Sequence, residues 1–497
     1  MCWRAKPTRE ANIRLNDLLL ILPDKEVIGD DNTEIEKIEY DSRLLESGDM
    51  FVALVGANLD GHDFVSEAAA KKVACVVLER DIECNVPVKV VVPDSRQALA
   101  LLAAKYHDFP SHHLKVLGVT GTNGKTTVTY LVKSILEEKG RKTGIIGTIE
   151  YAAGKHRFDA VNTTPESLQI ERLLSIMRDE RIRVAVMEVS SHALKAGRIK
   201  MIDFDVVGIT NLSQDHLDFH GDMENYKKTK ALLFDKAHGE EKWAILNMDD
   251  AEYDFFRGHV DSSYLACSIE NTHADLYATD IEAGPEGTCF RLVTPLGEED
   301  VKLRLIGDHN VSNAVCAAAF AMATGMDAAT IKRGLEAATF VPGRLEPIEN
   351  DRGVHIYVDY AHTPDALEHT CAVCRKLTER KLIVLFGCGG DRDKSKRKPM
   401  GEAVSRYADK IVVTSDNPRS EDPAAIIEDI KPGLDPSIET VIVEDRKDAI
   451  QAGLEASSEG DVLLVAGKGH EDYMIVGAEK IHFDDREVIR ELLGQEK

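Results

Sequence analysis

Short apolar runs alternate with longer amphipathic stretches along most of the chain, which is typical of α/β construction. Near the beginning, Met50–Leu54 and Ala74–Glu79 have the pattern of strands, and Phe64–Lys72 has that of a helix between them. The run Lys115–Thr120 predicts a buried strand, which leads through a glycine-rich turn into a helix over Thr126–Gly140. This alternation of strand-like and helix-like patterns predicts mostly parallel sheets covered by helices.

Two further groups of apolar runs follow at the spacing of successive βαβ units. The first group comprises Arg183–Ser190, Asp205–Asn211 and Lys242–Asp249, and the second comprises His355–Ala361, Lys381–Gly387, Lys410–Asp416 and Asp461–Gly467. Breaks fall at the proline- and histidine-containing stretch 107–115 and at Pro342–Gly343. We therefore predict three domains, with residues 1–110, 111–343 and 344–497, the last forming its own doubly wound sheet.

Composition and charge narrow the functional class. Hydrophobic residues make up 43% of the 497 residues, which is enough for several cores and excludes wholesale disorder. The 86 acidic and 61 basic residues leave a net charge of −25, which disfavours binding to nucleic acid or anionic membranes. We see no secretory signal, and the longest apolar run, from Ala314, is too short to span a bilayer. The nine scattered cysteines favour reduced thiols and a cytoplasmic location.

Cys371 and Cys374 form a CxxC pair, which could bind a metal or act in redox chemistry. The pair lies in a helical pattern, where a spacing of three places both thiols on one face. Neither a second CxxC nor a paired histidine motif accompanies it. We therefore expect core packing.

The clearest local motif is a glycine-rich loop between a strand and a helix. It comprises Gly121, Thr122, Asn123, Gly124, Lys125, Thr126 and Thr127. Small residues there let backbone N–H groups face a polyphosphate, and the helix dipole adds favourable charge. Lys125 would neutralise the β/γ-phosphate oxygens, and the Thr126 hydroxyl would bind Mg²⁺. The strict pattern requires glycine where Val119 stands, so this is a variant loop, and a plain glycine-rich turn is the alternative.

The loop predicts ATP or GTP binding but leaves the reaction open. A kinase, a switch GTPase, a motor and a ligase all use such a loop. The remaining motifs distinguish between these classes of protein.

Read together, the motifs resemble those of the Mur ligase family over the whole chain. In order, they are DSR from Asp41, GTNGKTT from Gly121, NTTP from Asn162, MEVSSHAL from Met187, TNLSQDHLDFHG from Thr210, GDHNVSN from Gly307, GRLE from Gly343, VDYAHTPD from Val358, GCGGDRDKSKRKPM from Gly387, SDNPRSEDP from Ser415 and GKGHE from Gly467. The resemblance implies an N-terminal uridine-binding α/β domain, a central P-loop ATPase-like domain and a C-terminal Rossmann-like domain that binds the amino acid.

The tetrapeptide Asp416–Arg419 resembles the one with which family members read diaminopimelate. The resemblance implies an ATP-dependent ligase of peptidoglycan biosynthesis, which adds meso-2,6-diaminopimelate to the D-glutamyl side-chain carboxylate of UDP-N-acetylmuramoyl-dipeptide through an acyl phosphate. L-Lysine as the added amino acid is the nearest alternative. Folylpolyglutamate synthetase and a nucleotide-dependent switch protein are more distant ones. We expect a monomer.

The resemblance also implies roles around ATP and its metal. Lys125 and Thr126 keep the roles given above, while Glu188 and His216 match family ligands for Mg²⁺. Lys230 matches a lysine that CO₂ converts to a carbamate, an oxygen ligand that Mg²⁺ accepts. Without the resemblance, a solvated helical lysine would be expected at 230, and Lys227 and Lys228 are nearby alternatives. Asn310 and Arg344 would lie around the nucleotide, together with His309, Asp359 and His362.

The substrate sites are implied in the same way. Those for the muramoyl-dipeptide are Asn162, Thr163, Thr164, Ser190 and Arg198, and those for uridine are Tyr40, Ser42, Ala57, Asn58 and Leu59. Ala196 stands where one family pattern has a polar residue. The amino-acid pocket would comprise Arg392, Asp416, Asn417, Pro418, Arg419, Gly467 and Glu471. The arginine fork of Arg419 suits the second carboxylate of diaminopimelate, which lysine lacks. The rest of the basic stretch, Lys394, Lys396, Arg397 and Lys398, is expected to be mostly a solvated loop.

Overall fold

The computed structural model describes residues 13–56, 59–284, 287–378 and 380–495. The chain forms two compact units. One extends to residue 278 and includes 292–299 and 312–334, and the other holds 279–291, 300–311 and the chain from 335 onward. Each has its own hydrophobic cores. Among the described residues, no helix combines the length and apolar character needed to cross a membrane.

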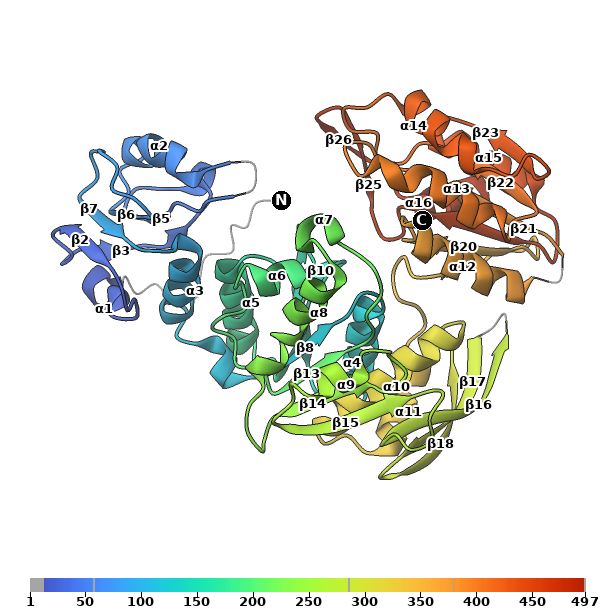
Figure 1. Ribbon diagram of the computed structural model, residues 1–497, viewed down its shortest axis with the longest axis horizontal. Coiled ribbons are helices and arrows are strands. Elements are labelled where there is room, and N and C mark those ends of the chain that lie inside the picture. Colours follow the sequence, from blue (N-terminus) through green and yellow to red (C-terminus); the bar gives the residue numbers. More distant parts are fainter. Residues whose placement is uncertain (1–12, 57–58, 285–286, 379, 496–497) are drawn as a thin grey trace. The chain divides into compact units, whose positions relative to one another are not determined.

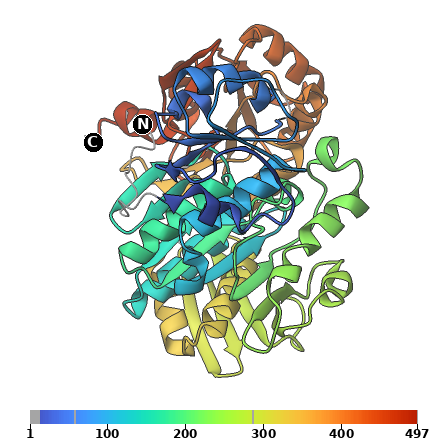
Figure 2. The same cartoon turned by 90° about the vertical axis from the view of Figure 1, so that its left-hand side faces the viewer.

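The first unit begins with a sheet of order β2-β7-β6-β5-β4 (Figure 1). Its strands are β2 (Glu26–Gly29), β4 (Ile38–Glu39), β5 (Met50–Val52), β6 (Cys75–Leu78) and β7 (Val88–Val91). The short strands β1 (Ile13–Arg14) and β3 (Glu34–Ile35) pair separately, and the helices are α1 (Leu15–Leu19), α2 (Val65–Ala70) and α3 (Ser95–Tyr106). Figure 2 gives a second view of these elements, coloured blue. Only β2 pairs antiparallel within the five-stranded sheet, and β4 to β7 run parallel.

A larger sheet follows, with the order β11-β10-β9-β12-β8-β13-β14-β15-β16-β17-β18 over the described residues. Its strands are β8 (Lys115–Thr120), β9 (Thr143–Ile146), β10 (Glu150–Ala153), β11 (His156–Asp159), β12 (Val184–Glu188), β13 (Val206–Ile209), β14 (Trp243–Asn247), β15 (Ser263–Ser268), β16 (Leu276–Gly284), β17 (Gly287–Thr294) and β18 (Gly297–Leu303). Within this order, the consecutive strands β9, β12, β8, β13, β14 and β15 pair in parallel with one another. The associated helices are α4 (Lys125–Glu138), α5 (Ser167–Asp179), α6 (Ser191–Lys195), α7 (Leu217–His220), α8 (Met223–Ala231), α9 (Tyr253–Arg257), α10 (Asp308–Ala323) and α11 (Ala328–Ala337).

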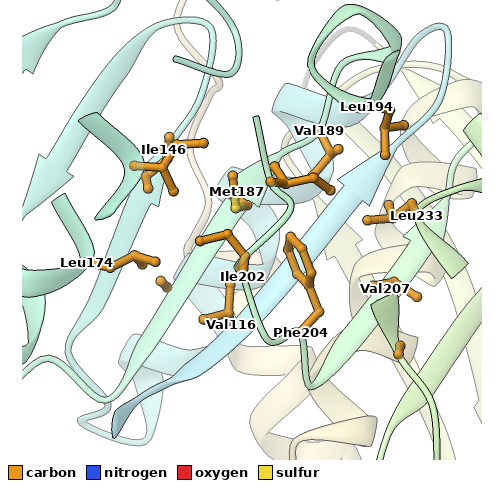
Figure 3. Close-up of a cluster of buried hydrophobic side chains, with 14 of the residues drawn as sticks. Val116, Ile146, Leu174, Met187, Val189, Leu194, Ile202, Phe204, Val207 and Leu233 are labelled. Carbon is orange, nitrogen blue, oxygen red and sulfur yellow. The ribbon is translucent and has the colours of Figure 1, made fainter. Parts of the chain in front are cut away.

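One face of this sheet carries a continuous apolar cluster (Figure 3). Phe204, which is fully buried, lies against β8, where a Cβ atom added to Gly118 would approach its ring to 2.6 Å. Position 118 therefore requires glycine, because the Phe204 ring occupies the space that a side chain would need. Met187 and Val207 contribute to the same cluster from the strands on either side of β8.

The second unit contains a six-stranded sheet of order β19-β20-β24-β21-β22-β23. Its strands are β19 (Glu346–Ile348), β20 (His355–Asp359), β21 (Leu382–Phe386), β22 (Lys410–Val413), β23 (Glu439–Ile442) and β24 (Val462–Ala466). Its helices are α12 (Pro364–Leu377), α13 (Arg397–Ser405), α14 (Pro423–Ile430), α15 (Arg446–Ala456) and α16 (Asp485–Leu492), and a hairpin of β25 (Tyr473–Val476) and β26 (Glu479–His482) precedes α16. All pairs are parallel except β19 with β20.

The strands predicted from apolar runs are confirmed, including the separate C-terminal sheet. The long strands β16 to β18 were not predicted, because their exposed faces interrupt the apolar runs with charged residues. Cys371 and Cys374 are fully buried in one core cluster of the second unit, so the expectation of core packing is confirmed. The domain boundaries at 110 and 343 stay predictions.

A buried ion pair joins α15 to α16. The Nε and Nη2 atoms of Arg446 each donate to Asp485 over 2.7 Å, and both side chains are 0% exposed. Arg446 also donates to the carbonyls of Ser415 and Ala466. Because a buried charge is costly without its partner, the pair makes the position of both helices depend on it.

We expect Arg446→Met to lower the free energy of unfolding by about 3–5 kcal/mol, because it leaves Asp485 buried and unpaired. The double variant Arg446→Met/Asp485→Leu should recover most of this loss. The control is Lys447→Met, which removes an exposed pair with Glu491 and should cost at most about 1 kcal/mol. Urea unfolding of the four proteins measures the effect, and a double variant as unstable as the single one would contradict this account.

Candidate functional site

The glycine-rich loop follows β8 and ends where α4 begins at Lys125. Gly121 and Gly124 have φ values of +142° and +83°, which side chains rarely adopt, and a Cβ atom at Gly121 would lie 1.9 Å from the Thr210 Oγ1. Asn211 fixes the loop, because its carbonyl accepts from the Thr122 N–H and its Oδ1 accepts from the Asn123 N–H. Thr126 and Thr127 are buried in the first turn of α4. The loop therefore has the strand–loop–helix form of a phosphate-binding site.

Two lysines converge on one carbonyl of this loop. The Lys125 Nζ donates to the carbonyls of Gly121 and Thr122, each over 2.9 Å, and the Lys230 Nζ donates to Gly121 over 2.8 Å. Lys230 is 1% exposed, so the expectation of a solvated helical lysine is wrong. Its burial, and then the nearby charge of Lys125, hold the pKa of Lys230 well below its usual range, against a smaller opposing effect of Asp215.

The Glu188 carboxylate lies beside this loop, at the end of β12. It is 1% exposed and accepts from the Thr126 hydroxyl at 3.0 Å, from the Thr148 hydroxyl at 2.9 Å and from the Thr148 N–H at 2.8 Å. The Thr148 hydroxyl also contacts that of Thr163 at 3.0 Å. A carboxylate among hydroxyls is an oxygen-rich environment of the kind that Mg²⁺ prefers.

His216 is connected to this group through Tyr226. It directly precedes α7 with φ of +52°, its Nε2 lies 3.4 Å from Asp215, and its ring packs edge-on against that of His192. The centre of its ring lies 6.5 Å from that of Tyr226, whose ring centre lies 4.6 Å from the Lys230 Nζ and whose hydroxyl lies 3.2 Å from the Thr122 Oγ1. Of the four predicted metal ligands, the structure thus joins Thr126 directly to Glu188, and joins Lys230 to the same loop through Gly121. Over the described residues, no cluster of three His, Cys, Asp or Glu side chains has the geometry of a metal site.

The residues predicted for the muramoyl-dipeptide surround the same strand ends. The Thr164 hydroxyl is fully buried, donates to the Glu188 carbonyl and accepts from the Ser190 N–H. The Ser190 side chain caps α6. Asn162 is exposed, and its carbonyl accepts from Tyr151. Thr164 therefore ties the loop from Asn162 to the end of β12.

Arg198 is half-buried beside this group and is held by an acidic residue that was not predicted. Its Nε donates to Glu166 over 2.8 Å and its Nη1 donates to the Thr164 carbonyl over 3.0 Å. Glu166 also accepts from Arg96 of α3, so one carboxylate orients two guanidinium groups.

The residues predicted for uridine lie in the N-terminal part of the first unit. The Tyr40 hydroxyl accepts from Gln169, and burial raises its pKa to about 12. Ser42 donates to Glu67 over 2.9 Å, while Leu59 is largely exposed. Ala57 and Asn58 lie outside the described residues.

In the second unit, three of the residues predicted for the nucleotide lie together around the start of β19 and the end of β20, namely Arg344, Asp359 and His362. The Asn310 side chain donates to the Ile306 carbonyl, and the Arg344 guanidinium lies 5.1 Å from the centre of the Tyr360 ring. Asp359 accepts from the backbone N–H groups of Leu345 and Ala361, and burial raises its pKa. His362 lies beside the Tyr360 ring, and burial lowers its pKa. His309 packs separately against His369.

Arg419 is anchored at the edge of a loop cluster. Its φ is +53°, its backbone pairs with β25, and its Nη1 donates to the Gly390 carbonyl over 2.8 Å. Within the described residues, no protein acceptor is hydrogen-bonded to its Nε or Nη2. The loop after β21 contains Gly390, and the loop after β22 contains Pro418 and Arg419. These two loops touch closely, because a Cβ atom at Gly390 would lie 1.9 Å from the Pro418 carbonyl oxygen. One end of the guanidinium is thus fixed and the other is left for an anion.

The neighbouring residues form a polar network. The Asn417 Nδ2 donates to Glu471 over 2.9 Å, and its Oδ1 accepts from the Ile475 N–H. Asp416 is buried with Oδ1 lacking a hydrogen-bond partner, while a Cβ atom at Gly467 would approach its Oδ2 to 2.9 Å. The Asn417 amide is therefore bound within the protein at both its nitrogen and its oxygen, and Oε2 of Glu471 is bound by Asn417.

The expectation that Lys396 and Arg397 belong to a solvated loop is wrong. Arg397 is 1% exposed and donates to Glu421 and Asp429, and the Lys396 Nζ donates to the His362 carbonyl. Glu421 also accepts from the Asp391 N–H, so Arg397 helps to bind the two pocket loops together. Arg392 is exposed, in the same loop.

Several residues of these networks were missed from the sequence, namely Arg96, Thr148, Glu166, Asn211 and Lys468. Glu166 directly follows the recognised motif NTTP, while Asn211 and Lys468 lie within the recognised motifs TNLSQDHLDFHG and GKGHE, which was a usable signal. Thr148 and Arg96 carry no local signal, because only the tertiary fold brings them to Glu188 and Glu166.

Comparison with known proteins matches three stretches of the chain to one family. Residues 34–107 match "Mur ligase family, catalytic domain", residues 119–321 match "Mur ligase middle domain", and residues 343–469 match "Mur ligase, glutamate ligase domain". Together the three stretches extend over most of both units.

Individual relatives are similar over nearly the full length. The UDP-N-acetylmuramoyl-L-alanyl-D-glutamate–2,6-diaminopimelate ligase of Geobacillus kaustophilus is 44% identical over 484 residues, which cover 96% of this chain and 99% of the relative. A solved structure of a ligase with that name has a TM-score of 0.68 and 30% identity, covering 97% of this chain and 99% of that one. The MurF ligase of Thermotoga maritima, solved in complex with ADP, has a TM-score of 0.64 at 20% identity and covers 92% and 96% of the two chains. With such identity along almost the whole sequence, this chain belongs to the Mur ligase family.

Proposed function

We propose that the chain is an ATP-dependent ligase that adds meso-2,6-diaminopimelate to the D-glutamyl side-chain carboxylate of UDP-N-acetylmuramoyl-L-alanyl-D-glutamate, in peptidoglycan biosynthesis. The identity to relatives named for this reaction supports it. The observation that carries the choice of amino acid is Arg419, whose guanidinium is anchored by Nη1 on Gly390 and has further donors for a second carboxylate. A cytoplasmic location and a monomeric state stay predictions.

The chemistry requires activation of a carboxylate. A free carboxylate is a poor acyl donor, because its leaving group would be oxide. Transfer of the γ-phosphoryl group of ATP to one carboxylate oxygen gives an acyl phosphate and ADP. The amine of the amino acid then attacks the acyl carbon, loses a proton and expels phosphate, which leaves the amide. The first step brings two anions together, so positive charge must be concentrated there.

The phosphate loop of the first unit meets this requirement. Its backbone turn and Lys125 would bind the polyphosphate at the start of α4, and Asn211 would keep the turn in shape. Thr126 and Glu188 fit a Mg²⁺ ion, because their oxygens already lie 3.0 Å apart in a buried, oxygen-rich setting. When bound, the ion would neutralise phosphate charge.

Lys230 is suited to become a carbamate. Its low pKa makes the neutral amine available, and the neutral amine is the form that attacks CO₂ and releases a proton. The product carries a negative charge beside Lys125, where the neutral amine carries none. Its oxygens also suit a hard cation. A carbamate at Lys230 would therefore be attracted by the Lys125 ammonium, which repels a protonated Lys230.

Arg198 would bind an anionic group of the muramoyl-dipeptide. Glu166 fixes its Nε and the Thr164 carbonyl fixes its Nη1, so the guanidinium is oriented before substrate arrives. Preorganisation of this kind reduces the ordering that binding requires.

The direct test is to mix the protein with ATP, Mg²⁺ and UDP-N-acetylmuramoyl-dipeptide, with diaminopimelate or L-lysine in parallel reactions. Mass spectrometry should find the diaminopimelate adduct together with ADP and phosphate, and at most traces of the lysine adduct. A predominant lysine product would replace the substrate assignment. Nucleotide hydrolysis without any adduct would support a switch protein instead.

We expect Lys230→Ala to lose most of the ligase activity, and short-chain carboxylic acids to restore part of it by supplying the missing oxygens. Lys230→Arg should stay inactive because it keeps the positive charge. Lys228→Ala, an exposed lysine on the same helix, is the matched control and should keep activity. Initial rates with and without added acetate measure the effect. Full activity of Lys230→Arg would show that the site needs a cation.

For Arg419→Ala, we expect kcat/KM for diaminopimelate to fall at least about a hundredfold, since removing one partner of a desolvated charge pair costs about 2–5 kcal/mol. Turnover of lysine should stay low or rise slightly, because the variant removes a charge that lysine leaves unpaired. The KM for ATP should change little. Arg406→Ala, which breaks an exposed pair with Glu368, is the control. Normal use of diaminopimelate with poor ATP binding would refute the assignment.

A further inference from the structure

Lys468, between the two glycines of GKGHE, is a fully buried lysine beside the amino-acid pocket. Its Nζ lies 3.3 Å from the Glu471 Oε2, 3.5 Å from the Asn417 Oδ1 and 3.9 Å from the Asp416 Oδ1. A buried ammonium is very costly unless carboxylates or other acceptors surround it. These three acceptors therefore account for the burial of a charged side chain at this position.

Lys468 is buried more deeply than the two carboxylates that it contacts. Its side chain is 0% exposed, whereas those of Asp416 and Glu471 are 8% and 15% exposed. The Glu471 Oε2 accepts from both Lys468 and Asn417, which leaves Oε1 of that carboxylate for a ligand. Any effect of Lys468 on a bound amino acid thus passes through the two carboxylates.

Lys468 sets the charge immediately around the two carboxylates. Asp416 and Glu471 contribute two negative charges, and the Lys468 ammonium contributes a positive one within 3.9 Å of both. Arg419 and Arg392 add their positive charges whatever stands at 468. The Arg446–Asp485 pair behind them is neutral by itself. Lys396, whose ammonium is bound to the His362 carbonyl, adds the same charge whatever stands at 468.

This balance distinguishes between two kinds of amino-acid terminus. The far end of diaminopimelate is a zwitterion with one ammonium and one carboxylate, so a neutral pocket with separated acids and guanidinium complements it. The far end of lysine is a lone ammonium, which a pocket with excess negative charge would favour. A cation that offsets one of the two carboxylate charges therefore shifts the preference of the pocket from the lone ammonium toward the zwitterion.

We propose that Lys468 is a specificity-determining positioning residue, which cancels one carboxylate charge and so makes the pocket select a zwitterionic terminus over a lone ammonium. The inference rests on the proposed function and deepens it. Nothing in it requires Lys468 to touch the substrate.

The test compares kcat/KM for diaminopimelate with kcat/KM for L-lysine in the wild type and in Lys468→Met, which replaces the ammonium by a neutral side chain of similar length. The ratio should fall at least about tenfold in Lys468→Met, the effect of one unit charge at a few ångströms and an effective dielectric of about 20. The KM for ATP should stay within about twofold. A general loss of structure would instead affect both amino acids and ATP alike.

The matched control is Lys480→Met, since Lys480 is exposed and lies 3.7 Å over the Tyr473 ring, whose centre lies 5.5 Å from the Lys468 Nζ. Its ratio should equal that of the wild type. A well-folded Lys468→Met with the wild-type ratio overturns the inference.

If Lys468→Met does not fold, the same comparison is made between Glu471→Gln and Lys468→Met/Glu471→Gln. In the double variant, the loss of the Glu471 carboxylate charge compensates for the loss of the Lys468 ammonium. The double variant should have the lower ratio, and equal ratios overturn the inference. A wild type that does not ligate diaminopimelate would refute the proposed function itself, so the two failures are distinguishable.

Discussion

The parallel pairing of β8 with β12 on one side and β13 on the other places the phosphate-binding end of the first unit. The register sets Glu188 opposite Val119 and Ile209 opposite Thr120, so the three strands end at nearly the same level. The Thr210 hydroxyl, directly after β13, therefore lies against the turn at Gly121. On the other side, Thr126 donates to Glu188 at the end of β12. In parallel sheets the carboxyl ends share one edge, and this edge is where ligands bind. A one-residue slip would separate Glu188 from Thr126.

The second unit repeats this arrangement with a different stabilising interaction. The loops after β24 and β22 carry Gly467 and the tetrapeptide from Asp416, and both begin beside Arg446, which donates to the carbonyls of Ala466 and Ser415. Asp485 holds that guanidinium in place. The ion pair that fixes two helices therefore also fixes the starting points of two pocket loops. Stability of this unit and the shape of its pocket depend on the same buried charges.

The sequence predicts the parts of this molecule that depend on local pattern. Buried strands appear as apolar runs, and the glycines of the phosphate loop appear because the turn excludes side chains. The environment of a charged side chain is different, because distant segments create it. Lys230 lies on a polar helix, but it is buried and donates to the carbonyl of Gly121, which is 109 positions away in the chain. Arg397 belongs to a basic stretch, but it is buried and donates to Glu421 and Asp429. A solvated lysine and a buried one have the same local signature, so only the resemblance to a family could separate them.

The two buried lysines show how neighbours decide what burial does to an ammonium. Lys230 faces a carbonyl and the cation Lys125, so burial and repulsion both favour the neutral amine, the form that can react with CO₂. Lys468 faces two carboxylates, so its environment compensates a charge that burial would otherwise disfavour. Both residues sit next to a loop that must handle anions. In the first unit the proposed anion is a polyphosphate, and a carbamate on Lys230 would help to hold the metal that accompanies it. In the second unit the proposed ligand is a zwitterion, and the charge of Lys468 would reduce the attraction of the two carboxylates for a lone cation.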